Sequence, residues 1–259
     1  MKKIFPIVNG IALVSTIFVN YLSNSGAFNG NTMKTVSDRY FNLFTPAGYA
    51  FSIWGLIYLG LFSFAIYTGR SLFTKQKLHP AVEKIGWWFL ISCICNSFWV
   101  VAWLYNYTLL SVGLMVMILI SLLKIILNLR ISLNKENIKD NIFISIPFTL
   151  YVGWISVAII ANIAAYLTKI QWDGFGLSST NWAIIMIVIA GLANIYMVTQ
   201  RNMRAFGLVG IWALLAIASN QSADATNIIY TCYGVSAVIA LSILINFAKP
   251  KYKDVSLGY

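Results

Sequence analysis

Residues Phe44–Tyr67 read FTPAGYAFSIWGLIYLGLFSFAIY, a run of apolar and aromatic side chains without a charge. About 20 helical residues at 1.5 Å each cross the roughly 30 Å hydrocarbon core of a bilayer, so this run is long enough to span a membrane. Pro46 stands where the helix begins, a position at which its missing N–H costs nothing. Phe51, Trp54 and Tyr58 fall at i, i+3 and i+7 and therefore share one helix face. Such a face either packs against other helices or lines an aromatic pocket.

The composition of the whole chain assigns it to the membrane. Of its 259 residues 59% are hydrophobic and 10% are charged, and the mean hydropathy is +0.78. Soluble domains carry about 25% charged residues, so we predict an all-α integral membrane protein whose first partner is the lipid bilayer. The net charge of +11 would suggest nucleic acid, but the cations lie in loops between apolar runs, and no nucleic-acid partner is expected.

Eight apolar runs predict about eight transmembrane helices, at approximately 4–22, 47–68, 85–105, 108–129, 142–167, 182–199, 205–220 and 227–247. The first run follows two lysines and resembles a signal peptide, but it is nearly of span length, and we expect it to be retained. If the eight runs alternate across the membrane, 15 of the 18 Lys and Arg residues fall on one side. Because positive loops stay in the cytoplasm, both termini are predicted to be cytoplasmic.

Two connections organise the chain. Residues 23–45 form the longest outer loop, rich in Asn, Ser and Gly, and loops of this length are often lids or binding loops. Gly174, Gly176 and the Ser178–Thr180 cluster mark a break before the sixth run. We therefore predict a five-helix unit over residues 1–168 and a three-helix extension over 169–259.

The third run carries a polar and aromatic stripe. Ser92, Asn96, Trp99 and Trp103 follow one another at spacings of four, three and four, which places them on one helix face. An Asn in hydrocarbon needs a partner, which is either another helix, water or a ligand. The stripe fits an interhelical hydrogen bond as well as it fits a ligand contact.

The fifth run repeats this arrangement with Tyr151, Trp154, Ala158 and Asn162. With alternating spans, Trp54, Trp99 and Asn162 each lie roughly 9–12 Å from the outer membrane face. Three helices thus bring aromatic and amide groups to similar depth, which suits a flat hydrophobic ligand held by stacking and a few hydrogen bonds.

The sequence carries no recognisable catalytic or metal-binding motif. No charged side chain sits at the middle of a span, and the three cysteines Cys93, Cys95 and Cys232 lack metal-ligand or disulfide-framework spacing. We therefore predict no catalytic residue, no metal site and no required cofactor, and a protein that is not an enzyme.

Together these motifs resemble the tryptophan-rich sensory protein family, the bacterial relatives of the translocator protein (TspO, the peripheral benzodiazepine receptor). The second-helix pattern is matched by Pro46, Tyr49, Phe51, Trp54 and Tyr58, with Tyr49 where the family usually has Trp. The third-helix pattern L-N-x-x-W appears with Cys95 in place of Leu, and the fifth-helix pattern W-x-x-x-A-x-x-x-N is met without gaps. The resemblance covers residues 1 to about 168, so the chain looks like an extended, eight-helix member whose first five helices form a TspO-like bundle.

The resemblance implies a ligand site, a ligand class and a location. The pocket would lie under the 23–45 loop and be lined by Tyr49, Phe51, Trp54, Tyr58, Asn96, Trp99, Trp103, Trp154, Ala158 and Asn162. Its ligand would be a hydrophobic small molecule, tetrapyrrole-like (porphyrin or haem) or sterol-like, bound for sensing or transport in the bacterial cytoplasmic membrane. A homodimer is compatible with the resemblance. Two alternatives are a transporter whose substrate path runs between the five-helix unit and the three added helices, and light- or oxygen-dependent porphyrin degradation.

Overall fold

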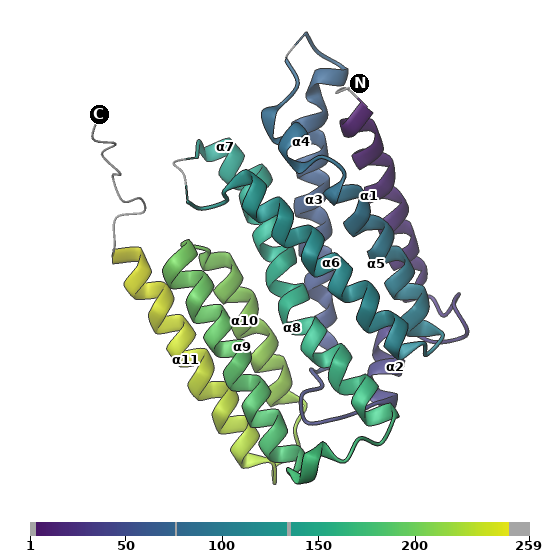
Figure 1. The fold of residues 1–259 in the computed structure, drawn as a ribbon, viewed down its shortest axis with the longest axis vertical. Helices are drawn as coiled ribbons and strands as arrows, with labels where there is room; N and C mark the ends of the chain where they lie inside the picture. The colour runs from purple at the N-terminus through teal and green to yellow at the C-terminus, as the bar shows by residue number, and fades with distance from the viewer. Residues whose placement is uncertain (1–3, 76, 134–135, 249–259) are drawn as a thin grey trace.

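The computed structural model describes residues 4–75, 77–133 and 136–248, and these residues form helices and connections without a strand. The long helices pack side by side along a common direction (Figure 1). They are α1 (Ile4–Leu22), α3 (Ile53–Gly69), α5 (Trp88–Leu104), α6 (Thr108–Leu129), α8 (Ile146–Lys169), α9 (Ser179–Arg201), α10 (Arg204–Ser219) and α11 (Thr226–Ala248). Shorter helical pieces are α2 (Met33–Arg39), α4 (Pro80–Ile85), α7 (Ile138–Asp140) and the turns η1 (Gly48–Ser52), η2 (Arg70–Leu72), η3 (Asn141–Ser145) and η4 (Gly174–Gly176).

Each of the eight predicted apolar runs overlaps one long helix, and six of these helices are long and apolar enough to cross a membrane, α3 being counted together with the adjoining turns η1 and η2. The other two are apolar but shorter, with 17 residues in α5 and 16 in α10. At 1.5 Å per residue they are about 26 Å and 24 Å long. The structure therefore supports a helical integral membrane protein.

The helix α8 lies at the centre of the molecule. It packs against α3 and α6 on one side and against α10 on the other, and more of it is buried than of any other of the six long helices. The helices α1, α3, α5 and α6 lie on the first side, while α9 and α11 pack with α10 on the second. Two groups of helices thus meet along α8 and α10.

The start of α8 shows how local sequence shapes this centre. A π-helical turn, η3, precedes α8, and Pro147 stands in the first turn of the helix, where its missing N–H is tolerated. A Cβ added to Gly60 of α3 would lie 3.2 Å from the Pro147 Cβ, so glycine permits the two helices to approach closely. The contact joins the second and fifth predicted runs.

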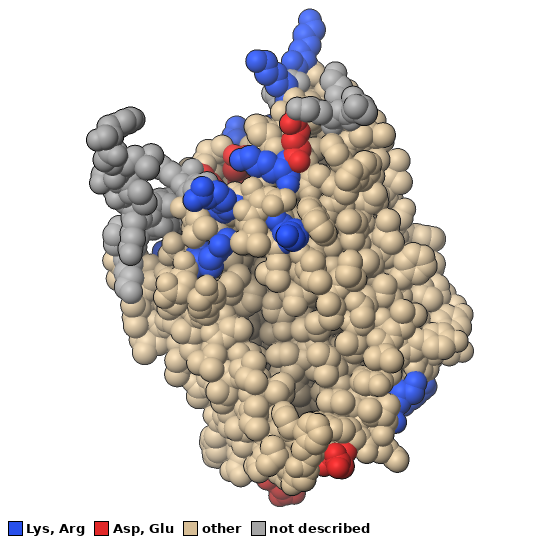
Figure 2. All heavy atoms as spheres, in the orientation of Figure 1, with Lys and Arg blue, Asp and Glu red and all other residues tan. Residues whose placement is uncertain are grey.

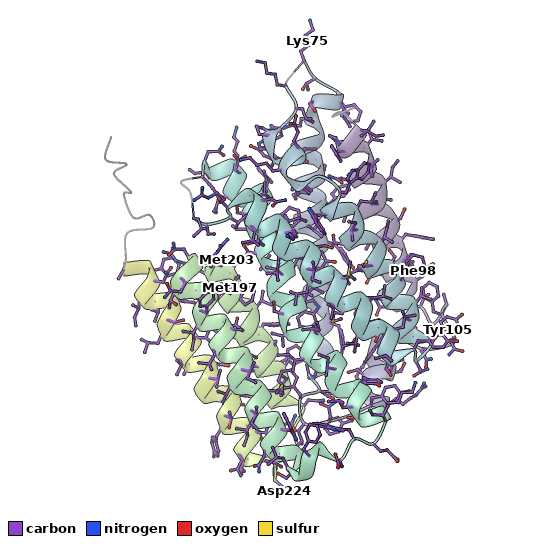
Figure 3. All side chains as sticks on the ribbon, in the orientation of Figure 1. Lys75, Phe98, Tyr105, Met197, Met203 and Asp224 are labelled. Carbon is purple, nitrogen blue, oxygen red and sulfur yellow. The ribbon has the colours of Figure 1, made fainter. Side chains whose placement is uncertain are left out.

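Charged side chains gather at the ends of the bundle (Figure 2). One end carries most of the visible Lys and Arg residues, and the long sides are uncharged in this view. The first turn of α1 and the last turn of α11 both lie at this basic end (Figures 1 and 2). Figure 3 labels Lys75 at the same end and Asp224 at the opposite one.

Candidate functional site

The indole of Trp54 is the centre of an aromatic cluster between α3, α5 and α8. Its ring stacks on Tyr58 at 5.3 Å and 19°, and lies 6.0 Å from Trp99. Tyr151 and Trp154 of α8 meet it edge to face at 5.7 and 6.5 Å. Offset and edge-to-face geometries of this kind are the favourable ones for aromatic pairs. The three predicted motifs therefore converge on one cluster.

A polar network lies beside this cluster. The fully buried Asn96 accepts a hydrogen bond from Asn20 Nδ2 at 2.8 Å and donates one to the Tyr151 hydroxyl at 3.0 Å. The Tyr58 hydroxyl also reaches Asn96 Oδ1, at 3.4 Å. The hydrogen bonds of Asn96 thus run between helices, which was one of the two roles that the sequence left open.

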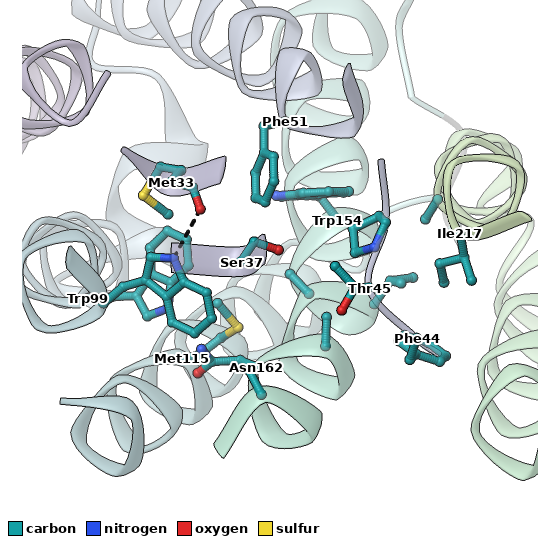
Figure 4. Close-up of a pocket in the computed structure, with 17 residues that line it drawn as sticks. Met33, Ser37, Phe44, Thr45, Phe51, Trp99, Met115, Trp154, Asn162 and Ile217 are labelled. Carbon is teal, nitrogen blue, oxygen red and sulfur yellow. Dashed lines mark hydrogen bonds between the residues drawn. The ribbon is translucent and has the colours of Figure 1, made fainter. Parts of the chain in front are cut away.

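On the other side of the tryptophans, a small cavity of about 40 Å³ lies between α5, α8 and the loop before α3 (Figure 4). A buried water needs about 10–15 Å³ of such volume, so the cavity holds only a few waters. Its walls are mostly apolar. The lining residues are Met33, Ser37, Phe44, Thr45, Pro46, Phe51, Trp99, Trp103, Met115, Trp154, Val157, Ala158, Ala161, Asn162, Ala165, Ala213 and Ile217. We call this space the aromatic cavity.

Six of the ten predicted site residues line the aromatic cavity: Phe51, Trp99, Trp103, Trp154, Ala158 and Asn162. Trp54, Tyr58 and Asn96 lie behind the tryptophans that line it. Asn162 also exchanges hydrogen bonds with Ser111 of α6, at 3.0 and 3.1 Å.

Tyr49 is the predicted residue that lies apart from the others. Its side chain is 46% exposed and packs edge to face on Trp212 of α10, with ring centroids 5.2 Å apart. Its hydroxyl accepts a hydrogen bond from Ser219 at 3.3 Å. Tyr49 therefore joins the two groups of helices and does not line the cavity.

The predicted lid lies over the aromatic cavity. Part of the lid forms the helix α2, whose N-terminus is stabilised by a capping box at Thr32. Met33 and Ser37 of α2 line the cavity. The Trp103 indole donates to the Met33 carbonyl at 3.4 Å, and Asn31 Nδ2 donates to the Leu104 carbonyl at 2.9 Å. The lid is thus fastened to the end of α5.

The segment 42–50, which continues from the lid into α3, is fastened to the opposite group of helices. Four hydrogen bonds join it to α10 and the two residues after that helix: from Ala47 N to Ala216 O (2.9 Å), from Trp212 Nε1 to Ala50 O (3.2 Å), from Asn220 Nδ2 to Thr45 O (3.1 Å) and from Gln221 Nε2 to Leu43 O (3.3 Å). Because Phe44, Thr45 and Pro46 line the cavity, α10 holds one of its walls in place.

Three buried indole N–H groups in the cluster lack a hydrogen-bond partner among the described residues: those of Trp54, Trp99 and Trp154. A buried donor without a partner costs about 1–3 kcal/mol, and most such groups in native proteins are paired. Trp99 and Trp154 line the aromatic cavity, so an acceptor placed there by water or a ligand would reach donors that the protein leaves free.

Several residues that line the aromatic cavity were not predicted from the sequence. Val157, Ala161 and Ala165 continue the Trp154–Asn162 face at helical spacing, so extending that periodicity would have found them. Ala213 and Ile217 come from α10, and no local pattern ties them to lining residues that lie at least 48 positions earlier in the chain. No cluster of three or more His, Cys, Asp or Glu residues that could hold a metal ion occurs within the described parts of the chain.

This architecture defines a helical membrane protein with an aromatic cavity that a loop covers. The family described as TSPO-like protein matches residues 6–245, and the chain therefore belongs to the TSPO-like family. The resemblance inferred from the three motifs is confirmed. The matched region extends through α9, α10 and most of α11, so these helices belong to the family pattern that the chain follows. No curated protein and no solved structure matches the chain.

Proposed function

We propose that the protein binds a flat hydrophobic molecule, tetrapyrrole-like or sterol-like, in the aromatic cavity, either to sense or to move it. The observation that carries the proposal is the set of three unpaired indole N–H groups, of which two belong to tryptophans that line the cavity. A planar ring can stack on these indoles while a polar edge accepts their hydrogen bonds. Membership of the TSPO-like family, whose members bind or sense small molecules, agrees with this role.

Binding requires the cavity to open. Pockets for small molecules measure about 300–1,000 Å³, whereas the aromatic cavity measures about 40 Å³. Its helical walls carry the tryptophans, and its remaining wall is the loop with α2 and the 42–50 segment. Displacement of this loop is the step that makes room for a tetrapyrrole, and the ligand then replaces contacts of Phe44 and Thr45.

We also propose that all eight long helices cross the bacterial cytoplasmic membrane, with both chain termini on the cytoplasmic side. The basic end of the bundle, which holds the start of α1 and the end of α11, supports this orientation. The lengths of α5 and α10 fall only a few ångström short of the hydrocarbon core, a mismatch that bilayers absorb. The homodimer stays a prediction.

Transport is the second candidate function. It is favoured by the position of Ala213 and Ile217 of α10 in the cavity wall, since relative movement of the two groups of helices would change the cavity. Movement of a bound porphyrin across the membrane of a proteoliposome distinguishes transport from sensing. Loss of porphyrin absorbance under illumination would instead support degradation.

The test of binding is a titration of the purified protein in detergent with protoporphyrin, followed by quenching of tryptophan fluorescence. Trp99→Phe reduces the stacking surface and removes an unpaired donor, and we expect it to raise Kd about tenfold. Trp87→Phe is the matched control, because Trp87 is 51% exposed and packs on Phe5, away from the cavity. An unchanged Kd in both Trp99→Phe and Trp54→Phe would place the ligand elsewhere.

A further inference from the structure

A second and much larger cavity, of about 630 Å³, lies between α8 and α9. Its walls come from Ile160, Ala164 and Leu167 of α8, from Ala183 and Met186 of α9, and from Phe44 of the lid. The space-filling view shows this face of the molecule hollowed between the two groups of helices (Figure 2). Its volume lies within the range of about 300–1,000 Å³ that small-molecule sites occupy, so it has room for a ligand without rearrangement.

The cavity is polar at one end and apolar at the other. Ile160 lies nine residues before the end of α8 and Met186 seven residues after the start of α9, so the cavity reaches about 10–14 Å along the helices. This inner part is lined by aliphatic side chains, and Ile163 among them is 39% exposed, so the cavity is open at the surface of the uncharged helices. An apolar chain can therefore enter from the bilayer.

The outer rim carries two tryptophans at the level where membrane proteins place interfacial aromatics. Trp172 and Trp182 lie 5.2 Å apart, and the Trp182 indole donates to the Gly174 carbonyl at 2.7 Å. Gln171 also lines the rim, and its side-chain amide makes no hydrogen bond to another described residue. The rim thus offers an amide to a polar head group.

The charge of the rim restricts that head group. Asp173 is the one charged side chain among the described residues that line the cavity, and its carboxylate accepts a hydrogen bond from Phe175 N at 3.1 Å. The nearby Lys169 is directed elsewhere, since its ammonium donates to the Asn106 carbonyl at 2.6 Å and lies over the Tyr40 ring. An anionic head would meet a like charge without a cation to offset it.

We propose that this α8–α9 cavity binds one uncharged amphipathic lipid of the bilayer, with its apolar chain between α8 and α9 and its hydroxyl or ester head at the Trp172–Trp182 rim. The site is separate from the aromatic cavity, and Phe44 is the residue that lines both. The proposal therefore stands whether or not the aromatic cavity binds a tetrapyrrole.

The test uses the full-length protein in phosphatidylcholine nanodiscs that contain a monoacylglycerol with a photoactivatable diazirine in its acyl chain. After illumination, mass spectrometry of the digested protein locates the adducts. We expect them on residues 160–168 and 179–186, and we expect excess unlabelled monoacylglycerol to remove them. The fatty-acid anion with the same chain should label these residues at least about fivefold less, because of Asp173.

Two alanines of α8 provide a matched pair of variants. Ala164 lines only the α8–α9 cavity, and Ala161, one turn earlier, lines only the aromatic cavity. Ala164→Phe fills the larger cavity and should lower the labelling at least about fivefold, whereas Ala161→Phe should leave it within about twofold. Ile163→Trp narrows the opening from the lipid side and serves as the second variant if Ala164→Phe does not fold, as judged by size-exclusion chromatography.

Three results would overturn the proposal. One is labelling that spreads over the lipid-facing sides of all helices and does not saturate. The second is equal loss in Ala164→Phe and Ala161→Phe, and the third is equal labelling by the fatty-acid anion.

Discussion

The two cavities border adjacent faces of one helix, α8, yet they are built in opposite ways. The aromatic cavity is small, about 40 Å³, and its walls are supported by the packed tryptophans and the hydrogen bonds of Asn96. The α8–α9 cavity is about 630 Å³ and has aliphatic walls. Aromatic and amide side chains at helical spacing can be recognised in the sequence, but these large side chains also occupy most of the space between the helices and leave a small cavity. Room for a ligand, by contrast, arises between α8 and α9, where the lining residues of the two helices form no recognisable pattern in the sequence.

The largest expected effect concerns the polar network beside the aromatic cavity, where the side chains are closely packed. Asn96→Leu removes hydrogen bonds to Asn20, Tyr151 and Tyr58 and leaves their polar atoms buried. Interhelical hydrogen bonds in membranes contribute about 0.6 kcal/mol on average and up to about 1.7, so we expect a loss of roughly 2–3 kcal/mol in the free energy of unfolding. Denaturant unfolding in detergent, followed by circular dichroism, measures it.

The matched control for Asn96→Leu is Thr168→Val at the α8–α9 cavity. Among the described residues, the Thr168 hydroxyl bonds only to the carbonyl of Ala164 in its own helix, at 2.9 Å, so its loss should change stability by less than about 0.5 kcal/mol. If the two substitutions cost the same, the polar network does not support the aromatic cavity.

An intermediate effect concerns the packing of α9 against α10. This packing holds α9 at its distance from α8 and so sets the width of the larger cavity. A Cβ added to Gly210 of α10 would lie only 2.2 Å from Asn194 Oδ1 of α9. Gly210→Ala must therefore displace the buried Asn194 amide, which donates to the Ala190 carbonyl at 2.8 Å, or separate α9 from α10, and we expect a loss of about 2 kcal/mol in unfolding free energy. Gly234→Ala of α11 is the control, since nothing lies within 4 Å of its added Cβ. A Gly210→Ala protein as stable as the Gly234→Ala protein would show that the contact is relieved at no cost.

Much of the fold could be predicted because hydrophobic length alone determines it. The apolar runs at 4–22 and 108–129 coincide with α1 and α6 to the residue, and the others differ at their ends by a few residues. The short helix α2 inside the lid was not predicted, because its seven residues carry no long apolar run. The division at residue 168 remains a prediction.

The candidate site could be predicted only as far as helical periodicity extends. Spacing placed Trp99 and Trp103 on one face of α5, and both line the aromatic cavity. It could not show that Tyr49, four residues before the start of α3 in the 3₁₀ turn, faces Trp212 instead. A 3₁₀ turn has about three residues per turn, so the α-helical register does not hold across it. The two lining residues from α10, Ala213 and Ile217, reach the cavity through tertiary packing, which no local sequence pattern indicates.

The smallest expected effect separates the two cavities by kinetics. Trp212→Phe keeps a ring against Tyr49 but removes the hydrogen bond to the Ala50 carbonyl, which fastens the 42–50 segment to α10. Such a bond contributes about 1 kcal/mol, so the segment should open more often, and protoporphyrin should associate with the aromatic cavity about three- to fivefold faster in stopped-flow fluorescence.

Trp182→Phe is the control for this last comparison, because it removes an equivalent indole bond, to the Gly174 carbonyl, at the rim of the larger cavity. If the 42–50 segment alone limits access to the aromatic cavity, this variant should bind protoporphyrin at the rate of the unchanged protein. Equal acceleration in both variants would mean instead that the ligand passes the Trp172–Trp182 rim first. A ligand would then occupy the α8–α9 cavity first and the aromatic cavity second, passing Phe44, which lines both.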